Sequence, residues 1–119
     1  MKTNLILTFY LFAFTLMGCH STCDCEKIAN SLTYNEAVIK AKECGASDSQ
    51  TTSKSSWIRK ISFYRCDETK GFLIMQTDKG EYIHSDVSQT VWNDFKNADS
   101  FGDFYNRNMR GRFQFVLKK

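Results

Sequence analysis

The sequence lacks the motifs that mark the common nucleotide-dependent and zinc enzymes. Its 119 residues contain no G-x-x-x-x-G-K, no G-x-G-x-x-G, no H-E-x-x-H and no C-x-x-C pair. The two histidines lie 64 positions apart and the serines gather in one polar segment, so no nucleophile–base pair is visible. We therefore expect no enzyme activity, no catalytic residue and no cofactor.

Proline, strong charge of one sign and very long apolar runs are also missing. The chain has no proline and a net charge of only +3, which is too mild to imply nucleic acid by itself. With 42% hydrophobic and 24% charged residues, the composition excludes a disordered chain. The length supports one small domain and excludes a multidomain enzyme or a polytopic membrane protein.

An apolar segment stands at the start of the chain. Lys2 precedes an uncharged stretch over 5–17, which as a helix spans only about 20 Å of a hydrocarbon core of about 30 Å. The layout is that of a secretory signal, not a transmembrane anchor. Cutting after residue 18 leaves 101 residues with 15 basic and 13 acidic side chains, a net charge of +2.

The segment ends in Leu16-Met17-Gly18-Cys19, which resembles the lipobox of bacterial lipoproteins. The resemblance implies that Cys19 receives a diacylglyceryl group and that the chain is cut before it; Met17 departs from the smaller residue usual there. Because His20, not Asp, follows, we expect the outer membrane as the site of anchoring. The alternative is an ordinary signal peptide with a coincidental cysteine.

Four further cysteines remain, namely Cys23, Cys25, Cys44 and Cys66. In an exported domain of this size they predict two disulfides. A Cys23–Cys25 bridge would close a very small, strained ring, so each of these two is expected to pair with Cys44 or Cys66. A zinc or copper site built from His20, Cys23 and Cys25 is the rival interpretation. Since only Asp24 separates the two thiols, we expect no metal.

The remaining chain divides by composition. Thr33 with Glu36 fits a helix capping box, Gly45 stands where a helix stops, and the next residues carry almost no apolar side chain. The expected order is a signal peptide at 1–18, a Cys-rich tether at 19–30, an accessory helix at 31–45, a linker at 46–55 and the main domain at 56–119.

The main domain is expected to be α+β. Apolar runs at 57–64, 72–77 and 81–84, joined by short polar turns, predict a three-stranded antiparallel meander. One or two helices follow: the first begins near Asp86 or Ser88, and a shorter one covers 103–109. Residues 113–117 could form a short last strand at an edge.

From Ser56 onward the chain resembles the KTSC domain, which occurs at the C-terminus of some lysyl-tRNA synthetases and alone in small bacterial proteins. The residues that carry the resemblance are Ser56, Ile58, Ile61, Tyr64, Gly80, Tyr82, Val87, Val91, Trp92, Ala98, Ser100, Gly102, Phe104, Tyr105, Asn106, Met109, Arg110 and Phe113. Two positions depart from the family pattern: His84 replaces a second tyrosine, and Ser88 replaces a proline. The resemblance implies no established activity, and RNA binding rests only on the synthetase context.

Basic and aromatic residues alternate near the C-terminus. No acid follows Asp103, and arginines with aromatic rings can hold phosphates and stack on bases. Upstream Asp86, Asp94, Asp99 and Asp103 could instead neutralise this stretch. The cations there are Arg107, Arg110, Arg112, Lys118 and Lys119, interleaved with Tyr105, Phe113 and Phe115.

Two functions follow from these features. We expect a lipid-anchored envelope protein that binds an envelope protein or an anionic envelope partner through the sheet or the basic loop. RNA binding through the basic, aromatic loop is the alternative. His84 could equally be a packing substitute and the arginines a solvated surface. The candidate binding residues are Tyr82, His84, Tyr105, Asn106, Arg107, Arg110, Arg112 and Phe113.

Overall fold

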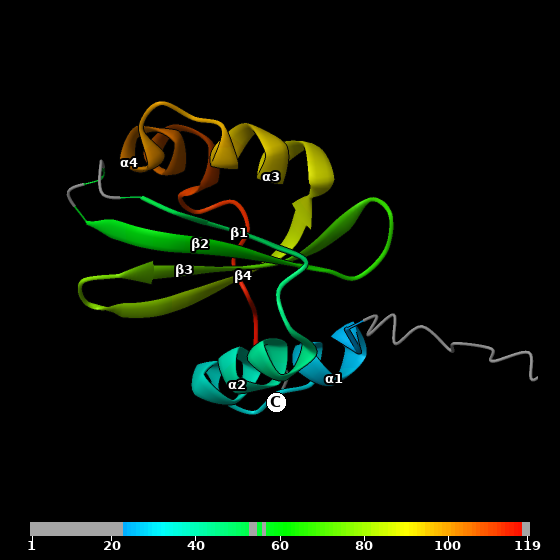
Figure 1. The fold of residues 1–119 in the computed structure, drawn as a ribbon. Helices are drawn as coiled ribbons and strands as arrows, with labels where there is room; N and C mark the ends of the chain where they lie inside the picture. Colours follow the sequence, from blue (N-terminus) through cyan, green and yellow to red (C-terminus); the bar gives the residue numbers. More distant parts are fainter. Residues whose placement is uncertain (1–22, 53–54, 56, 118–119) are drawn as a thin grey trace, which may run out of the picture.

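The computed structural model describes residues 23–52, 55 and 57–117, so the signal segment and Cys19 lie outside the described residues. The fold is α+β, with helices on both faces of one sheet (Figure 1). The elements are α1 (Cys25–Ala29), α2 (Tyr34–Cys44), β1 (Asp48–Thr51), β2 (Ile58–Arg65), β3 (Lys70–Thr77), β4 (Gly80–Ser88), α3 (Gln89–Lys96), α4 (Phe101–Phe104) and the π-helix η1 (Tyr105–Met109). No helix within these ranges is long and apolar enough to cross a membrane.

The sheet is an antiparallel meander in the order β1-β2-β3-β4. It confirms the three expected strands and adds a fourth. Residues 46–55, expected to be a linker, contain β1, which pairs with β2 from Asp48↔Phe63 to Thr51↔Lys60. The polar composition wrongly predicted a linker, because an edge strand needs backbone hydrogen bonds and no apolar face of its own.

The face of the sheet that contacts α3 and α4 carries an aromatic core. Trp92 of α3 is fully buried and stacks on Phe63 of β2, with ring centroids 5.4 Å apart. Phe95 stacks on Phe104 at 5.1 Å and meets Phe101 edge-on. Ser88 caps the start of α3 by accepting from the Val91 N–H at 3.1 Å, as the sequence predicted. This packing holds the C-terminal helices on the sheet.

The opposite face is covered by α1 and α2, which we call the N-terminal layer (Figure 1). The capping box at the start of α2 is confirmed: the Glu36 N–H donates to Thr33 Oγ1, and the Leu32 N–H donates to Glu36 Oε2. Within the expected tether, the Asp24 side chain caps the extra helix α1. The helices of this layer bury four side chains among the described residues, and most of them are small: Ile28, Ala37, Val38 and Ala41.

Two disulfides fasten the N-terminal layer. Cys23 pairs with Cys44, which joins the start of α1 to the end of α2, and Cys25 pairs with Cys66 just after β2. This is one of the two pairings that the sequence left open. It also removes the rival metal site, because both thiols that it needs are oxidised.

The C-terminal strand expected at 113–117 is reduced to a single antiparallel bridge between His84 and Gln114. The chain then leaves the edge of β4, and the ring of Phe115 packs against Phe72 and Tyr34 on the N-terminal layer. Burial of that aromatic ring outweighs continued strand pairing. The helix expected at 103–109 is split between α4 and η1.

Candidate binding site

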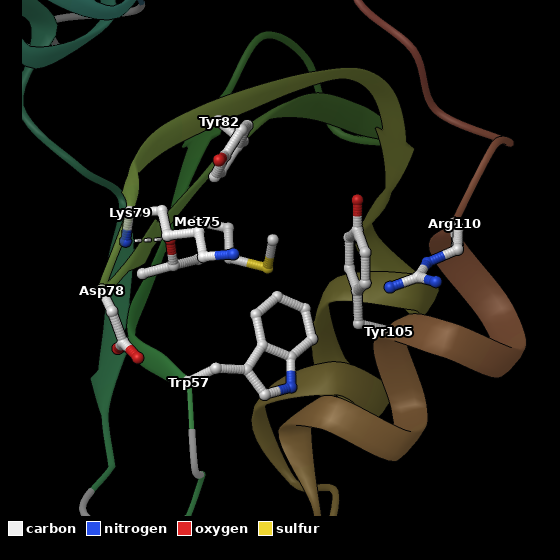
Figure 2. A pocket seen from close by; sticks show the side chains of 8 residues that line it. Trp57, Met75, Asp78, Lys79, Tyr82, Tyr105 and Arg110 are labelled. Atoms are coloured by element: carbon white, nitrogen blue, oxygen red, sulfur yellow. Dashed lines mark hydrogen bonds between the residues drawn. The ribbon is translucent and has the colours of Figure 1, made fainter.

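A groove opens between the C-terminal helices and one end of the sheet (Figure 2). Its volume is about 380 Å³, and five side chains from different parts of the chain form most of its walls. We call it the aromatic groove and define it by Trp57, Met75, Tyr82, Tyr105 and Arg110. In Figure 2 the ring of Tyr105 stands between Tyr82 and the guanidinium of Arg110.

The π-helix η1 places Tyr105 and Arg110 at this groove. The Arg110 N–H donates to the Tyr105 carbonyl at 2.9 Å, a bond that spans five residues instead of four. The wider turn still lets Met109 bury its side chain completely. Such π segments occur often at functional sites, because they change the direction of side chains within a helix.

Gly102 makes room for the indole of Trp57. A Cβ atom on Gly102 would lie 2.8 Å from Trp57 Nε1, so only glycine allows the indole to pack directly against α4. The indole in turn meets the Tyr105 ring edge-on, with centroids 5.6 Å apart. Trp57 is therefore a fixed wall of the groove, although it is partly exposed.

His84 supports Tyr105 from behind. Its Nε2 lies 3.1 Å from the Tyr105 hydroxyl, and the imidazole is only 6% exposed. Burial lowers the pKa of His84 below its usual 6.5, and interactions with the backbone of Leu73 and Tyr82 oppose this shift. The ring is therefore neutral at pH 7 and can accept the Tyr105 O–H at Nε2. Nδ1 has no hydrogen-bond partner among the described residues.

The charge at the groove is positive. Within the described part of the chain, Arg110 forms no ion pair, and Lys79 lines the same groove. The one carboxylate in the lining, Asp78, pairs with Arg59 at 3.0 Å. Burial raises the pKa of Tyr105, and the nearby charge of Arg110 partly opposes that rise. Aromatic surface beside unpaired cations suits an anionic ligand with a flat or apolar part.

A second depression continues from the groove along the edge of β4. It has a volume of about 690 Å³ and shares Tyr82, Tyr105 and Arg110 with the groove. Its wall adds His84 and Phe113, so the structure brings five of the eight candidate residues together.

The other three candidates lie elsewhere. Asn106 and Arg112 are exposed outside both depressions, and Arg107 lines a small hollow with Asp99 and Asp103. The upstream carboxylates that could neutralise the arginines include Asp99 and Asp103, which lie next to Arg107 in this hollow. Asp86 pairs with Lys70 at 3.2 Å, and among the described residues none of the four upstream carboxylates forms an ion pair with Arg107, Arg110 or Arg112.

Sequence reasoning missed five residues that line the groove, namely Trp57, Met75, Thr77, Asp78 and Lys79. Trp57 was assigned to the apolar run of the first strand, yet it precedes β2 and its indole faces the groove. Met75 looked like an ordinary strand residue, and Lys79 a turn residue. Only the pairing of Met75 with Tyr82 across β3 and β4 would have indicated the site, and that register follows from the turn at Lys79.

The meander, its C-terminal helices and the groove define a small α+β domain with one open, basic and aromatic site. The model of the KTSC domain family matches residues 54–113, about half of the chain. The protein therefore belongs to the KTSC family. Helices α1 and α2 and strand β1 precede the matched region.

A solved structure is also similar to this chain. It is the crystal structure of a KTSC domain protein from Yersinia pestis, with 26% identity and a TM-score of 0.49. The match covers 60% of this chain and 97% of that one. The search of curated proteins found no match.

Proposed function

We propose that this protein is a non-enzymatic, lipid-anchored envelope protein whose KTSC domain binds an anionic ligand in the aromatic groove. The observation that carries the proposal is the arrangement of Trp57, Tyr82 and Tyr105 beside Arg110, a cation without a carboxylate partner in the described residues. Tyr82 is 47% exposed, so its ring is accessible to a ligand in the groove.

The lipid anchor rests on the sequence. An apolar segment behind Lys2 ends in Leu16-Met17-Gly18-Cys19, and the two disulfides further along suit an oxidising compartment outside the cytoplasm. Two or three acyl chains hold a protein stably on a membrane, whereas one binds it only marginally.

The chemical class of ligand follows from the walls of the groove. Arg110 and Lys79 can bind a phosphate or carboxylate, while the faces of the aromatic rings can cover a sugar or another flat ring. Phosphorylated sugars of the cell envelope combine both features. Nucleic acid also combines them, but an exported protein rarely meets it.

Trp57 provides the measurement. Trp92 is fully buried, so a Trp92→Phe protein leaves Trp57 as the only tryptophan and a reporter of the groove. We expect glucose 1-phosphate or purified lipopolysaccharide to change its emission in a saturable way, and neutral glucose to bind at least tenfold more weakly. Arg110→Ala should abolish the change, whereas Arg107→Ala, outside the groove, should retain it.

Two results would contradict the proposal. Equal responses of the Arg110→Ala and Arg107→Ala proteins would show that the groove is not the site. Tight binding of a single-stranded RNA oligonucleotide, with affinity falling steeply as salt rises, would instead favour the nucleic-acid function.

A further inference from the structure

Several large apolar side chains are exposed on α2 and in the segments beside it. In the part of the chain that the structure describes, Leu32 is 72% exposed, Tyr34 56% and Ile39 49%. Val116 is 73% exposed and directly follows Phe115, whose ring packs against Tyr34. On the domain that matches the family, by contrast, Tyr82 of the groove is the exposed large apolar residue.

These side chains are not buried in the core of the protein. Helix α2 buries Ala37, Val38 and Ala41 against the sheet, and Ile39 lies about 200° around the helix from Ala37. Covering such a side chain is favourable, because apolar surface is removed from water. Contact with a surface outside the domain would remove them from water.

The tether to Cys19 points to the membrane as that surface. Only three residues separate Cys19 from Cys23, so their Cα atoms lie at most about 14 Å apart. Cys23 is bonded to Cys44 and Cys25 to Cys66, which ties the start of α1 to both α2 and the sheet. Acyl chains on Cys19 would thus hold the N-terminal layer close to the lipid.

The described chain ends next to the N-terminal layer. Leu117 packs against the core of the N-terminal layer, and the sequence continues with Lys118 and Lys119. The aromatic groove and Cys66 lie at opposite ends of β2, because Trp57 precedes this strand whereas Cys66 follows it.

We infer that the N-terminal layer lies flat on the membrane, with Leu32, Ile39 and Val116 in the lipid interface and the aromatic groove turned away from it. This inference rests on the proposed lipid anchor. The occupant of the apolar surface is a phospholipid bilayer, and its contact orients the site toward ligands in the surrounding compartment.

Added tryptophans test this orientation without disturbing the core. The acylated protein is purified from membranes, its lipid is verified by mass, and it is reconstituted into phosphatidylethanolamine–phosphatidylglycerol vesicles with or without brominated acyl chains. Ile39→Trp and Val116→Trp place a fluorophore on the proposed lipid face. Asp94→Trp places one on the exposed side of α3, across the sheet.

We expect brominated lipid to quench the emission added by Ile39→Trp and Val116→Trp, and to leave that of Asp94→Trp and the native tryptophans within about a tenth of its value. Acylated protein could float with the vesicles and yet have the added emission of all three variants quenched equally by brominated lipid. That result would overturn the orientation and retain the anchor. Protein without a lipid mass would overturn the anchor, and with it this inference.

Discussion

The two faces of the sheet are covered in different ways. Helices α3 and α4 are held by large buried side chains, among them Trp92, Phe95 and Phe101. The N-terminal layer buries mainly Ile28 and small residues, and two disulfides fasten it. Both layers bury apolar surface against the sheet, and among the described residues the N-terminal layer is the one that disulfides also fasten.

The difference separates two tasks. The layer with the aromatic core belongs to the region that the KTSC family model matches, and it builds the groove. The cross-linked layer precedes that region and stands next to Cys19 in the sequence. The proposed lipid anchor would join the domain through this layer, and the two disulfides would make that connection firm.

Truncation of the aromatic core should have the largest effect. Because Trp92 is fully buried against Phe63, Trp92→Ala should lower the free energy of unfolding by about 3–5 kcal/mol. Urea denaturation measures this. Trp57→Ala, which removes a partly exposed ring, is the matched control and should cost much less; equal losses would contradict the assigned core.

Removal of one disulfide should affect only the N-terminal layer. The double substitution Cys23→Ser and Cys44→Ser should lower the free energy of unfolding by about 2–4 kcal/mol, since the disulfide closes a loop across a sequence separation of 21. Hydrogen exchange should become faster in α1 and α2 and remain unchanged in α3. Faster exchange throughout α3 would show that the two layers do not differ as described.

A smaller loss of stability is expected from a substitution in the edge strand β1. Asp48 accepts from Trp92 Nε1 at 3.0 Å and from Lys96 Nζ at 2.8 Å, and these partners, Lys96 first, lower its pKa. Since the Asp48 side chain is 42% exposed, Asp48→Asn should cost below about 1 kcal/mol and should speed exchange in β1. Asp86→Asn, which removes an exposed pair with Lys70, should leave both quantities unchanged.

The smallest effect at neutral pH concerns His84. Its folded pKa is lowered by burial, so the unfolded chain binds more protons, and stability should fall as the pH drops from about 6.5 through the folded pKa. His84→Phe should remove this part of the pH dependence while changing stability little at pH 8. Thermal melts between pH 5 and pH 8 measure both; identical pH profiles would refute the role of burial.

The sequence predicted the elements that have local signals. Thr33, Ser88 and Gly45 mark helix ends where the structure has them, and alternating apolar runs marked β2 and β3. It missed β1, because the strand is held by backbone pairing and by the distant contact of Asp48 with Trp92. Such contacts depend on the tertiary fold and leave no local pattern.

The candidate site was predicted only in part, for the same reason. Tyr82, Tyr105 and Arg110 stood out by residue type and by the family resemblance, and the structure brings them together. Trp57 was missed because its role depends on Gly102, 45 positions later in the sequence. No spacing rule connects two such positions before the fold is known.

The most direct test of the account is palmitate labelling with membrane fractionation of the native protein and of Cys19→Ser. The account predicts that the native protein carries the label and sediments with membranes, and that both properties are lost in the variant. Unlabelled, soluble native protein would contradict a lipid-anchored envelope function and would make nucleic acid the leading ligand for the groove.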